Sequence, residues 1–219
     1  MPEPITVAIV GGGGAAVILG LAKRQFGVFK ELMDLVGGCL ATILFMPVML
    51  LCAVIVKFSD PGGPILYRQV RVGLNGRLFT IYKFRSMYMD AEKHGQAIKA
   101  GAEDPRVIPG CRWMRMSHID EIPQLFNILR GEMSLVGPRP ERPELFEALS
   151  REVPDFERRL AVKPGLTGMA QIYNGYDTDS DSVKRKLAMD LEYIEKMSLG
   201  LELKLLAATL TKFRDQGAR

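Results

Sequence analysis

A long uncharged segment dominates the hydrophobic pattern of this chain. No charged residue occurs from Leu35 to Val56. As a helix with a rise of ~1.5 Å per residue, this segment would extend ~33 Å, about the thickness of the hydrocarbon core of a bilayer. The alternative, a core helix of a soluble protein, would be shorter or would carry a polar stripe. The pattern therefore predicts a membrane helix.

Two features indicate that this helix enters the membrane and returns to the same side. Pro47 lies near its middle, where proline removes a backbone hydrogen bond and bends a helix. Basic residues flank both ends, and the positive-inside rule draws both ends toward the cytoplasm. These residues are Lys23, Arg24 and Lys30 before the segment and Lys57, Arg68, Arg71 and Arg77 after it. The sequence predicts a Pro-kinked re-entrant helix over residues 29–58.

Residues 1–28 form a Gly-rich apolar extension in this interpretation. The Gly11–Gly14 run imitates a dinucleotide-binding motif, which needs a second strand ending in Asp or Glu about 20 residues later. Lys23-Arg24 and the second apolar run follow instead. The remaining interpretations are an accessory membrane helix and an extension without defined structure.

A β-hairpin is expected directly after the membrane helix. Asn75-Gly76 separates two runs rich in Val, Ile, Tyr and Phe, and both residues tolerate the positive φ of a tight turn. Strands are therefore predicted over 65–72 and 77–84.

A short helix is expected to begin near Asp120. Its apolar residues recur at helical spacing on one face, and they are Ile122, Leu125, Phe126 and Leu129. Gly131 stands where helix ends favour glycine. Pro123 is tolerated only in the first turn, which places Asp120 and Glu121 at the N-terminus of the helix.

The acidic pair at this helix start has two interpretations. Asp as an N-cap and Glu in the first turn both stabilise a helix. The same position also binds phosphate groups. Arg112 and Arg115 precede the pair and the Gly137–Pro140 turn follows it, so a phosphorylated substrate with a divalent cation would fit here.

Two helical patterns close the chain, over residues 183–196 and 202–212. Their leucines, at positions 199, 201, 203, 205 and 206, form an apolar stripe. Such a stripe can lie on the bilayer interface or pack onto the domain.

Composition excludes several classes of protein. The chain has 219 residues, 47% of them hydrophobic and 25% charged, which excludes a disordered chain. Its three cysteines and two histidines exclude a disulfide scaffold and a zinc finger. The net charge of +4 gives no indication of a nucleic-acid partner.

From about Phe29 to Thr209 the chain resembles the bacterial sugar transferases, the monotopic polyprenyl-phosphate phosphoglycosyltransferases. The resemblance rests on a series of blocks in a fixed order after the Pro-broken helix. These blocks are Arg68–Gly73, Phe79–Met87, Asp104–Arg106, Asp120–Asn127, Gly131–Pro140, Lys163–Gln171 and the helix around Asp190.

The resemblance implies an α+β, mainly helical fold: a Pro-kinked re-entrant membrane helix, followed by a cytoplasmic domain over residues 59–219 with a β-hairpin and interfacial amphipathic helices. The enzyme would sit in the bacterial inner membrane and transfer a sugar-1-phosphate from a nucleoside diphosphate sugar to undecaprenyl phosphate. It would use Asp120 as the nucleophile, with Glu121 as a catalytic residue and a Mg²⁺ ligand. The implied substrate-binding residues are Lys83, Arg85, Arg115, Arg139, Gln171 and Asp190.

Three departures from the family pattern qualify these expectations. Met46-Pro47 replaces a common Ser-Pro, Glu202 stands where Asp is common, and Ile172–Gly175 adds one residue beside a substrate loop. The alternative is a membrane-anchored binding or scaffold protein that has lost catalysis. The sugar, the nucleotide, the oligomeric state and the glycan pathway stay open.

Overall fold

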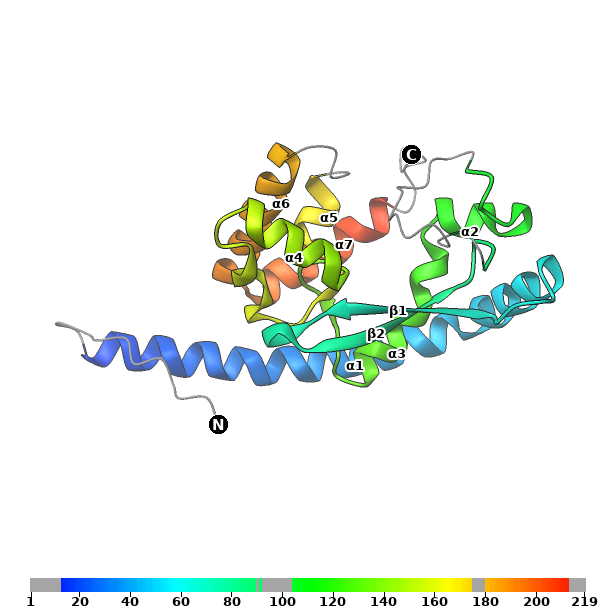
Figure 1. The fold of residues 1–219 in the computed structure, drawn as a ribbon. Coiled ribbons are helices and arrows are strands. Elements are labelled where there is room, and N and C mark those ends of the chain that lie inside the picture. The colour runs from blue at the N-terminus through cyan, green and yellow to red at the C-terminus, as the bar shows by residue number, and fades with distance from the viewer. Residues whose placement is uncertain (1–12, 90, 92–103, 175–179, 213–219) are drawn as a thin grey trace.

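The computed structural model describes residues 13–89, 91, 104–174 and 180–212. This part of the chain is mainly helical, with a small β-hairpin and one long apolar helix at its start (Figure 1). In chain order the elements are α1 (Gly13–Ser59), β1 (Leu66–Val72), η1 (Leu74–Gly76), β2 (Leu78–Phe84), η2 (Pro109–Cys111), α2 (Arg112–Met116), η3 (Ile119–Gln124), α3 (Leu125–Leu129), β3 (Ser134–Val136), α4 (Pro143–Glu152), η4 (Phe156–Ala161), β4 (Gly165–Thr167), α5 (Met169–Tyr173), α6 (Ser180–Lys196) and α7 (Leu199–Lys212).

The predicted hairpin is confirmed nearly to the residue. Strands β1 and β2 pair antiparallel, from Leu66 opposite Phe84 to Val72 opposite Leu78. Asn75 and Gly76 have φ values of 53° and 77°, the left-handed conformations that asparagine and glycine tolerate best. The turn chemistry therefore fixes the register of both strands.

Helix α1 is one continuous element that passes through Pro47. It begins at Gly13, so no break in secondary structure marks the expected boundary at residue 28. Figure 1 shows a gradual change of direction along the helix and no reversal of the chain. Phe26–Ser59 is long and apolar enough to cross a membrane, and 22% of its most apolar segment is buried within the protein. A re-entrant path remains a prediction.

One face of α1 packs along the rest of the protein from Lys30 to Val56. Figure 1 shows the helix running beneath the hairpin, and α3 packs against it. Two glycines allow this close approach: a Cβ at Gly37 would lie 2.6 Å from a methyl of Leu135, and one at Gly38 would lie 3.1 Å from Ile128. The opposite face carries exposed apolar residues, which include Val28, Leu32, Leu35, Val36, Leu40, Ile43, Leu44, Leu50, Leu51, Val54 and Phe58.

A buried polar network joins the N-terminal part of α1 to the domain. The Lys30 ammonium donates to Glu202 at 2.8 Å, to Asp34 at 3.1 Å and to the Ser134 hydroxyl at 2.6 Å. The Tyr193 hydroxyl donates to the other oxygen of Glu202 at 2.7 Å. Glu202, which departs from the family pattern, therefore ties α7 to α1 through a fully buried carboxylate.

Two hydrophobic clusters meet beneath the acidic pair. One cluster joins α3, β3, α6 and α7, and the other joins the C-terminal part of α1 to Phe84 and Met114. Ile122, which follows the acidic pair, packs against both. The packing of the whole domain therefore positions Asp120 and Glu121.

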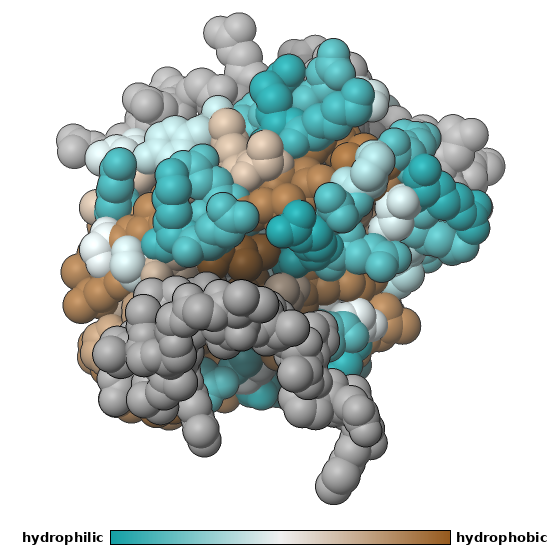
Figure 2. Space-filling view, turned by 90° about the vertical axis from the view of Figure 1, so that its left-hand side faces the viewer, coloured by the Kyte–Doolittle hydropathy of each residue, from teal (hydrophilic) through white to brown (hydrophobic). Residues whose placement is uncertain are grey.

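One expectation about an apolar face needs correction, and a second question is answered. Phe126, expected on the buried face, is 37% exposed, and Ile128 is buried at 3% exposure. Leu125 is buried as expected. The C-terminal leucines divide: Leu205 is buried and Leu201 and Leu206 pack on the core, whereas Leu199 and Leu203 are exposed. Figure 2 shows hydrophilic residues over the upper part of one end of the molecule and hydrophobic residues at its lower left.

Candidate active site

The acidic pair lies in the 3₁₀ helix η3 and is almost completely buried. Asp120 is 6% exposed and Glu121 is 8% exposed. His118, in a left-handed conformation with φ 56°, occupies the cap position, and no side chain caps the helix. The expectation that Asp120 is an N-cap is therefore wrong, and its carboxylate is available for another role.

Glu121 is held by two cations from distant parts of the chain. The Lys83 ammonium, on β2, donates to Oε1 at 2.7 Å. The Arg139 guanidinium, from the loop after β3, donates to Oε1 at 2.7 Å and to Oε2 at 3.1 Å. This two-pronged contact fixes the plane of the carboxylate as well as its position.

These contacts set the charge states of the group. Burial by itself would raise the pKa of Glu121, but Arg139 and Lys83 hold that pKa well below its usual range. Burial lowers the pKa of Lys83, and Glu121 opposes this effect. Glu121 raises the pKa of Arg139. Glu121 is therefore an anion at neutral pH, paired with Lys83 and Arg139.

Asp120 differs sharply from its neighbour. Burial, followed by the charge of Glu121, raises the pKa of Asp120 to about 7, although Lys83, Arg115 and Arg139 pull it down. Among the described residues, no hydrogen bond or ion pair engages this carboxylate. A buried, unpaired carboxylate beside a cationic group is a strong candidate for chemistry.

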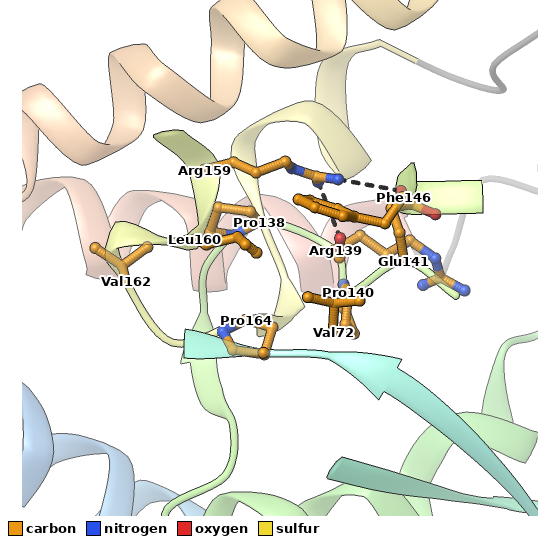
Figure 3. Close-up of a pocket in the computed structure, with 11 residues that line it drawn as sticks. Val72, Pro138, Arg139, Pro140, Glu141, Phe146, Arg159, Leu160, Val162 and Pro164 are labelled. Atoms are coloured by element: carbon orange, nitrogen blue, oxygen red, sulfur yellow. Dashed lines mark hydrogen bonds and ion pairs between the residues drawn. The ribbon is translucent and has the colours of Figure 1, made fainter. Parts of the chain in front are cut away.

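The backbone that carries Arg139 is fixed at three successive carbonyls. Arg159 donates to the carbonyl of Arg139 at 2.9 Å, and Arg71 donates to that of Pro140 at 2.9 Å. The amide of Val72 donates to the carbonyl of Glu141 at 2.9 Å. Figure 3 shows the Arg159 guanidinium reaching both the Arg139 carbonyl and the Glu141 side chain, beside a small pocket. Arg139 is thus held in place before any ligand binds.

Asp190 lies in a buried ionic cluster behind this loop. It pairs with Arg159 at 2.7 Å, and Arg159 pairs with Glu141 at 3.3 Å. Lys186 also donates to Glu141. Burial raises the pKa of Asp190, while for Glu141 the cations Lys186 and Arg159 overcome burial and lower the pKa to about 2. Asp190 therefore contacts Arg159, which holds the loop that carries Arg139, and does not contact Glu121.

The other predicted residues are distributed around the site. Arg115 contributes positive charge near Asp120. Arg85 is 2% exposed and pairs with Asp60 at 3.0 Å, in the turn after α1. The Gln171 amide donates to the carbonyl of Leu166 at 3.0 Å. The structure thus brings Lys83, Arg115 and Arg139 together with the acidic pair.

Sequence reasoning missed the roles of Arg71, Glu141 and Arg159. The sequence places Arg71 in the basic flank of the membrane helix and in the Arg68–Gly73 block, but assigns it no role at the site. Glu141 immediately follows the Gly137–Pro140 turn. Their positions next to these motifs were the available signal, but only the tertiary structure brings Arg159 to them.

Comparison with known proteins identifies the family. Residues 25–216 match the model of the bacterial sugar transferases, and the chain belongs to this family. It is 40% identical over 200 residues to the UDP-N-acetylgalactosamine-undecaprenyl-phosphate N-acetylgalactosaminephosphotransferase of Aeromonas hydrophila, covering 91% of this chain and 47% of that protein. It is 39% identical over 183 residues to the UDP-glucose:undecaprenyl-phosphate glucose-1-phosphate transferase of Caulobacter vibrioides, covering 83% of this chain and 68% of that protein.

A third relative shows the same partial coverage. The undecaprenyl-phosphate glucose phosphotransferase of Komagataeibacter xylinus is 40% identical over 188 residues, which are 84% of this chain and 35% of that protein. The chain thus spans about half or less of the length of two of these three relatives. Together with the long apolar helix, the family supports association of the protein with a membrane.

Replacing Arg139 with Lys is expected to weaken the site although it keeps the charge. Lysine cannot reproduce a two-pronged contact, so Glu121 would lose one of its charged hydrogen bonds, worth roughly 1.5–3 kcal/mol. We expect kcat/KM in a sugar-phosphate transfer assay to fall by about 10- to 100-fold. Arg77→Lys, at an exposed position of the hairpin turn, is the matched control, and equal losses in both variants would contradict the assigned role.

Proposed function

We propose that the protein transfers a sugar-1-phosphate from a UDP-sugar to undecaprenyl phosphate and so begins the synthesis of a membrane-bound glycan. The observation that carries the proposal is the unpaired Asp120 carboxylate, buried beside the Lys83–Glu121–Arg139 group. The names of the relatives support the two substrates, and because those names differ in the sugar, the sugar itself is left to experiment.

The proposed reaction has two steps at one phosphorus atom. A carboxylate oxygen of Asp120 attacks the phosphorus that bears the sugar, the bond to the uridine-bearing phosphate breaks, and UMP leaves. A phosphate oxygen of undecaprenyl phosphate then attacks the same phosphorus, the bond to Asp120 breaks, and the carboxylate is restored. No separate base is needed, because the Asp120 carboxylate is itself ionised at a pH above its pKa of about 7.

The cations around the acidic pair fit the demands of this chemistry. An anionic carboxylate must approach an anionic diphosphate, and positive charge must offset the repulsion in the transition state. Arg139 is about one third exposed at its side chain (37%) while Lys83 is 16% exposed. Arg139 can therefore face a bound diphosphate while it still orients Glu121, and Arg115 adds charge on the side of Asp120.

The acidic pair also fits a bound Mg²⁺. No group of three or more potential metal-binding side chains occurs among the described residues, but Mg²⁺ commonly uses one or two carboxylates and completes its shell with phosphates and water. Glu121 and Asp120 supply two adjacent carboxylates, and the Asp120 carboxylate has no hydrogen-bond or ion-pair partner among the described residues. When bound, Mg²⁺ would neutralise the diphosphate of the donor.

We further propose that α1 lies in the cytoplasmic leaflet of the bacterial inner membrane without crossing it. Its buried face follows the domain from Lys30 to Val56, so a perpendicular crossing would carry the charged network around Glu202 into hydrocarbon at a large cost. Its outer face is apolar along the same length. This placement would hold the active site near the headgroups, where the phosphate of the lipid acceptor lies.

Cysteine labelling tests this topology. We expect Lys23→Cys and Gly62→Cys, on either side of the apolar segment, both to react with a membrane-impermeant maleimide from the cytoplasmic side only. Native Cys39 is exposed at the protein surface and should be protected by lipid. Labelling of the two introduced cysteines from opposite sides would establish a crossing helix and contradict the proposal.

A turnover assay tests the proposed reaction. Purified protein with Mg²⁺, undecaprenyl phosphate and each of a panel of nucleotide sugars should release UMP with at least one UDP-sugar and form a lipid-linked sugar diphosphate. Release of UDP, or no turnover with any donor, would contradict the proposal. The second result would instead favour the inactive membrane-anchored scaffold.

A further inference from the structure

Two arginines share one tyrosine ring on the side of the hairpin away from Lys83. Arg68 stands opposite Tyr82 in the β1–β2 register, and its guanidinium carbon lies 5.8 Å from the centre of the ring. The guanidinium carbon of Arg130, at the end of α3, lies 5.0 Å from the same centre, and Arg130 donates to the Tyr82 hydroxyl at 2.7 Å. Both guanidinium groups therefore lie against the ring of Tyr82.

These two charges have no acidic counterpart in the described part of the chain. No carboxylate there forms an ion pair with Arg68 or Arg130, whereas Lys83, Arg85, Arg139 and Arg159 all have such pairs. Both arginine residues are exposed. Neighbouring guanidinium groups without a carboxylate partner are well suited to a phosphate, which accepts hydrogen bonds from both.

Arg130 lies in a part of the chain that packs on the apolar helix α1. Leu129 would be 3.3 Å from a Cβ at Gly38 of α1, and Lys163, near Gly131, pairs with Glu31 of α1 at 3.3 Å. Arg130 lies between these two contact points. The α1 segment that they flank exposes Leu32, Leu35 and Val36 on the face turned away from the domain, a surface that suits acyl chains.

Apolar residues beside the arginines favour a lipid over a free anion. Val70 is 47% exposed and Leu78 is 62% exposed. Side chains alternate between the faces of a strand, so both lie on the same face of the hairpin as Arg68 and Tyr82. Lys83 lies on the opposite face, with the catalytic group, and a phosphate at Tyr82 would therefore not be the reacting one.

We propose that Arg68, Tyr82 and Arg130 form a binding site for the phosphate of an anionic phospholipid headgroup. The site rests on the proposed placement of α1 in one leaflet, but it does not depend on the transfer reaction. Its occupancy would fix the rotation of the domain about α1, so that the Lys83 face of the hairpin meets substrates arriving in the membrane.

Native mass spectrometry of the full chain in a neutral detergent tests the site. We expect phosphatidylglycerol to bind more tightly than phosphatidylcholine with the same acyl chains. The double variant Arg68→Gln/Arg130→Gln should lose about 25-fold in affinity for phosphatidylglycerol, since each basic residue at an anionic surface contributes about fivefold. Tyr82→Phe, which removes only the hydroxyl that orients Arg130, should show a smaller loss.

A charge-matched control separates this site from general basicity. Arg77→Gln/Arg185→Gln removes the same charge at two other exposed positions and should keep the preference for phosphatidylglycerol. Equal losses in both double variants, or an unchanged preference in Arg68→Gln/Arg130→Gln, would overturn the proposal. Displacement of the lipid by inorganic phosphate alone would show an anion site and overturn the lipid assignment. The binding measurement uses no nucleotide sugar and no undecaprenyl phosphate. Failure of the lipid site is therefore distinguishable from failure of the proposed transfer reaction.

Discussion

Asp120→Asn should abolish sugar-phosphate transfer and at the same time stabilise the protein above pH 7. The amide has nearly the same shape as the carboxylate but cannot attack phosphorus, and loss of a covalent nucleophile lowers kcat by about 10⁴-fold or more. The amide also removes a negative charge that the fold buries beside Glu121. Loss of activity together with increased stability is not expected of a residue with a purely structural role.

The stability effect should depend on pH in a specific direction. The pKa of Asp120 is about 7 in the folded protein and ~3.9 in an unfolded chain, so the folded state holds the extra proton between these values. The wild type should therefore lose stability relative to Asp120→Asn as the pH rises above ~4. The difference should level off above about pH 7, on the order of 2–4 kcal/mol.

Thermal unfolding in metal-free buffer between pH 4 and 8 measures this difference. Asp155→Asn makes the same chemical change at an exposed position whose φ of 64° asparagine accepts, and it should show no such trend. A difference between wild type and Asp120→Asn that is constant with pH would contradict the assignment. In the wild type, the rate of sugar-phosphate transfer should rise with increasing pH as Asp120 loses its proton, with an apparent pKa near 7.

Arg159→Ala should destabilise the protein more than any surface charge substitution. It would leave the carboxylates of Asp190 and Glu141 buried with one fewer cation, and breaking a buried pair in this way costs about 3–5 kcal/mol. The Arg139 carbonyl would lose its partner as well. For a protein of this size, the midpoint of thermal unfolding should fall by roughly 6–20 °C.

The neighbouring arginine supplies the control. Arg158 is 59% exposed and its contact with Asp155 spans 3.7 Å, so Arg158→Ala should cost only about 0–1 kcal/mol. Similar midpoints for the two variants would show that the buried cluster around Arg159 does not stabilise the loop that carries Arg139.

Local chemistry made part of this fold predictable. Asn75-Gly76 fixed the hairpin, because its preference for positive φ depends on no distant contact. The uncharged run from Leu35 to Val56 likewise predicted a long helix, because this signal also depends on no distant contact. The helix at Asp120 was placed correctly but with the wrong geometry, since the pattern of apolar residues does not distinguish a 3₁₀ turn that begins at a left-handed His118 from a regular helix with an Asp cap.

The arrangement of the site could not be predicted from local sequence patterns, because its residues come from distant parts of the chain. Glu121 meets Lys83 from a strand 38 residues earlier and Arg139 from a loop 18 residues later, and only the packing of both hydrophobic clusters brings them together. Arg85 and Asp190 were chosen because they lie in motif blocks, but burial directs them to Asp60 and Arg159. A charged residue within a family motif can thus support the site without facing it.

Intact-protein mass spectrometry with a UDP-sugar that supports turnover, in the absence of the lipid acceptor, tests the central claim most directly. The account predicts a mass increase equal to one sugar phosphate, localised to Asp120, lost when undecaprenyl phosphate is added and absent from Asp120→Asn. Turnover without any such adduct, or an adduct on another residue, would contradict it.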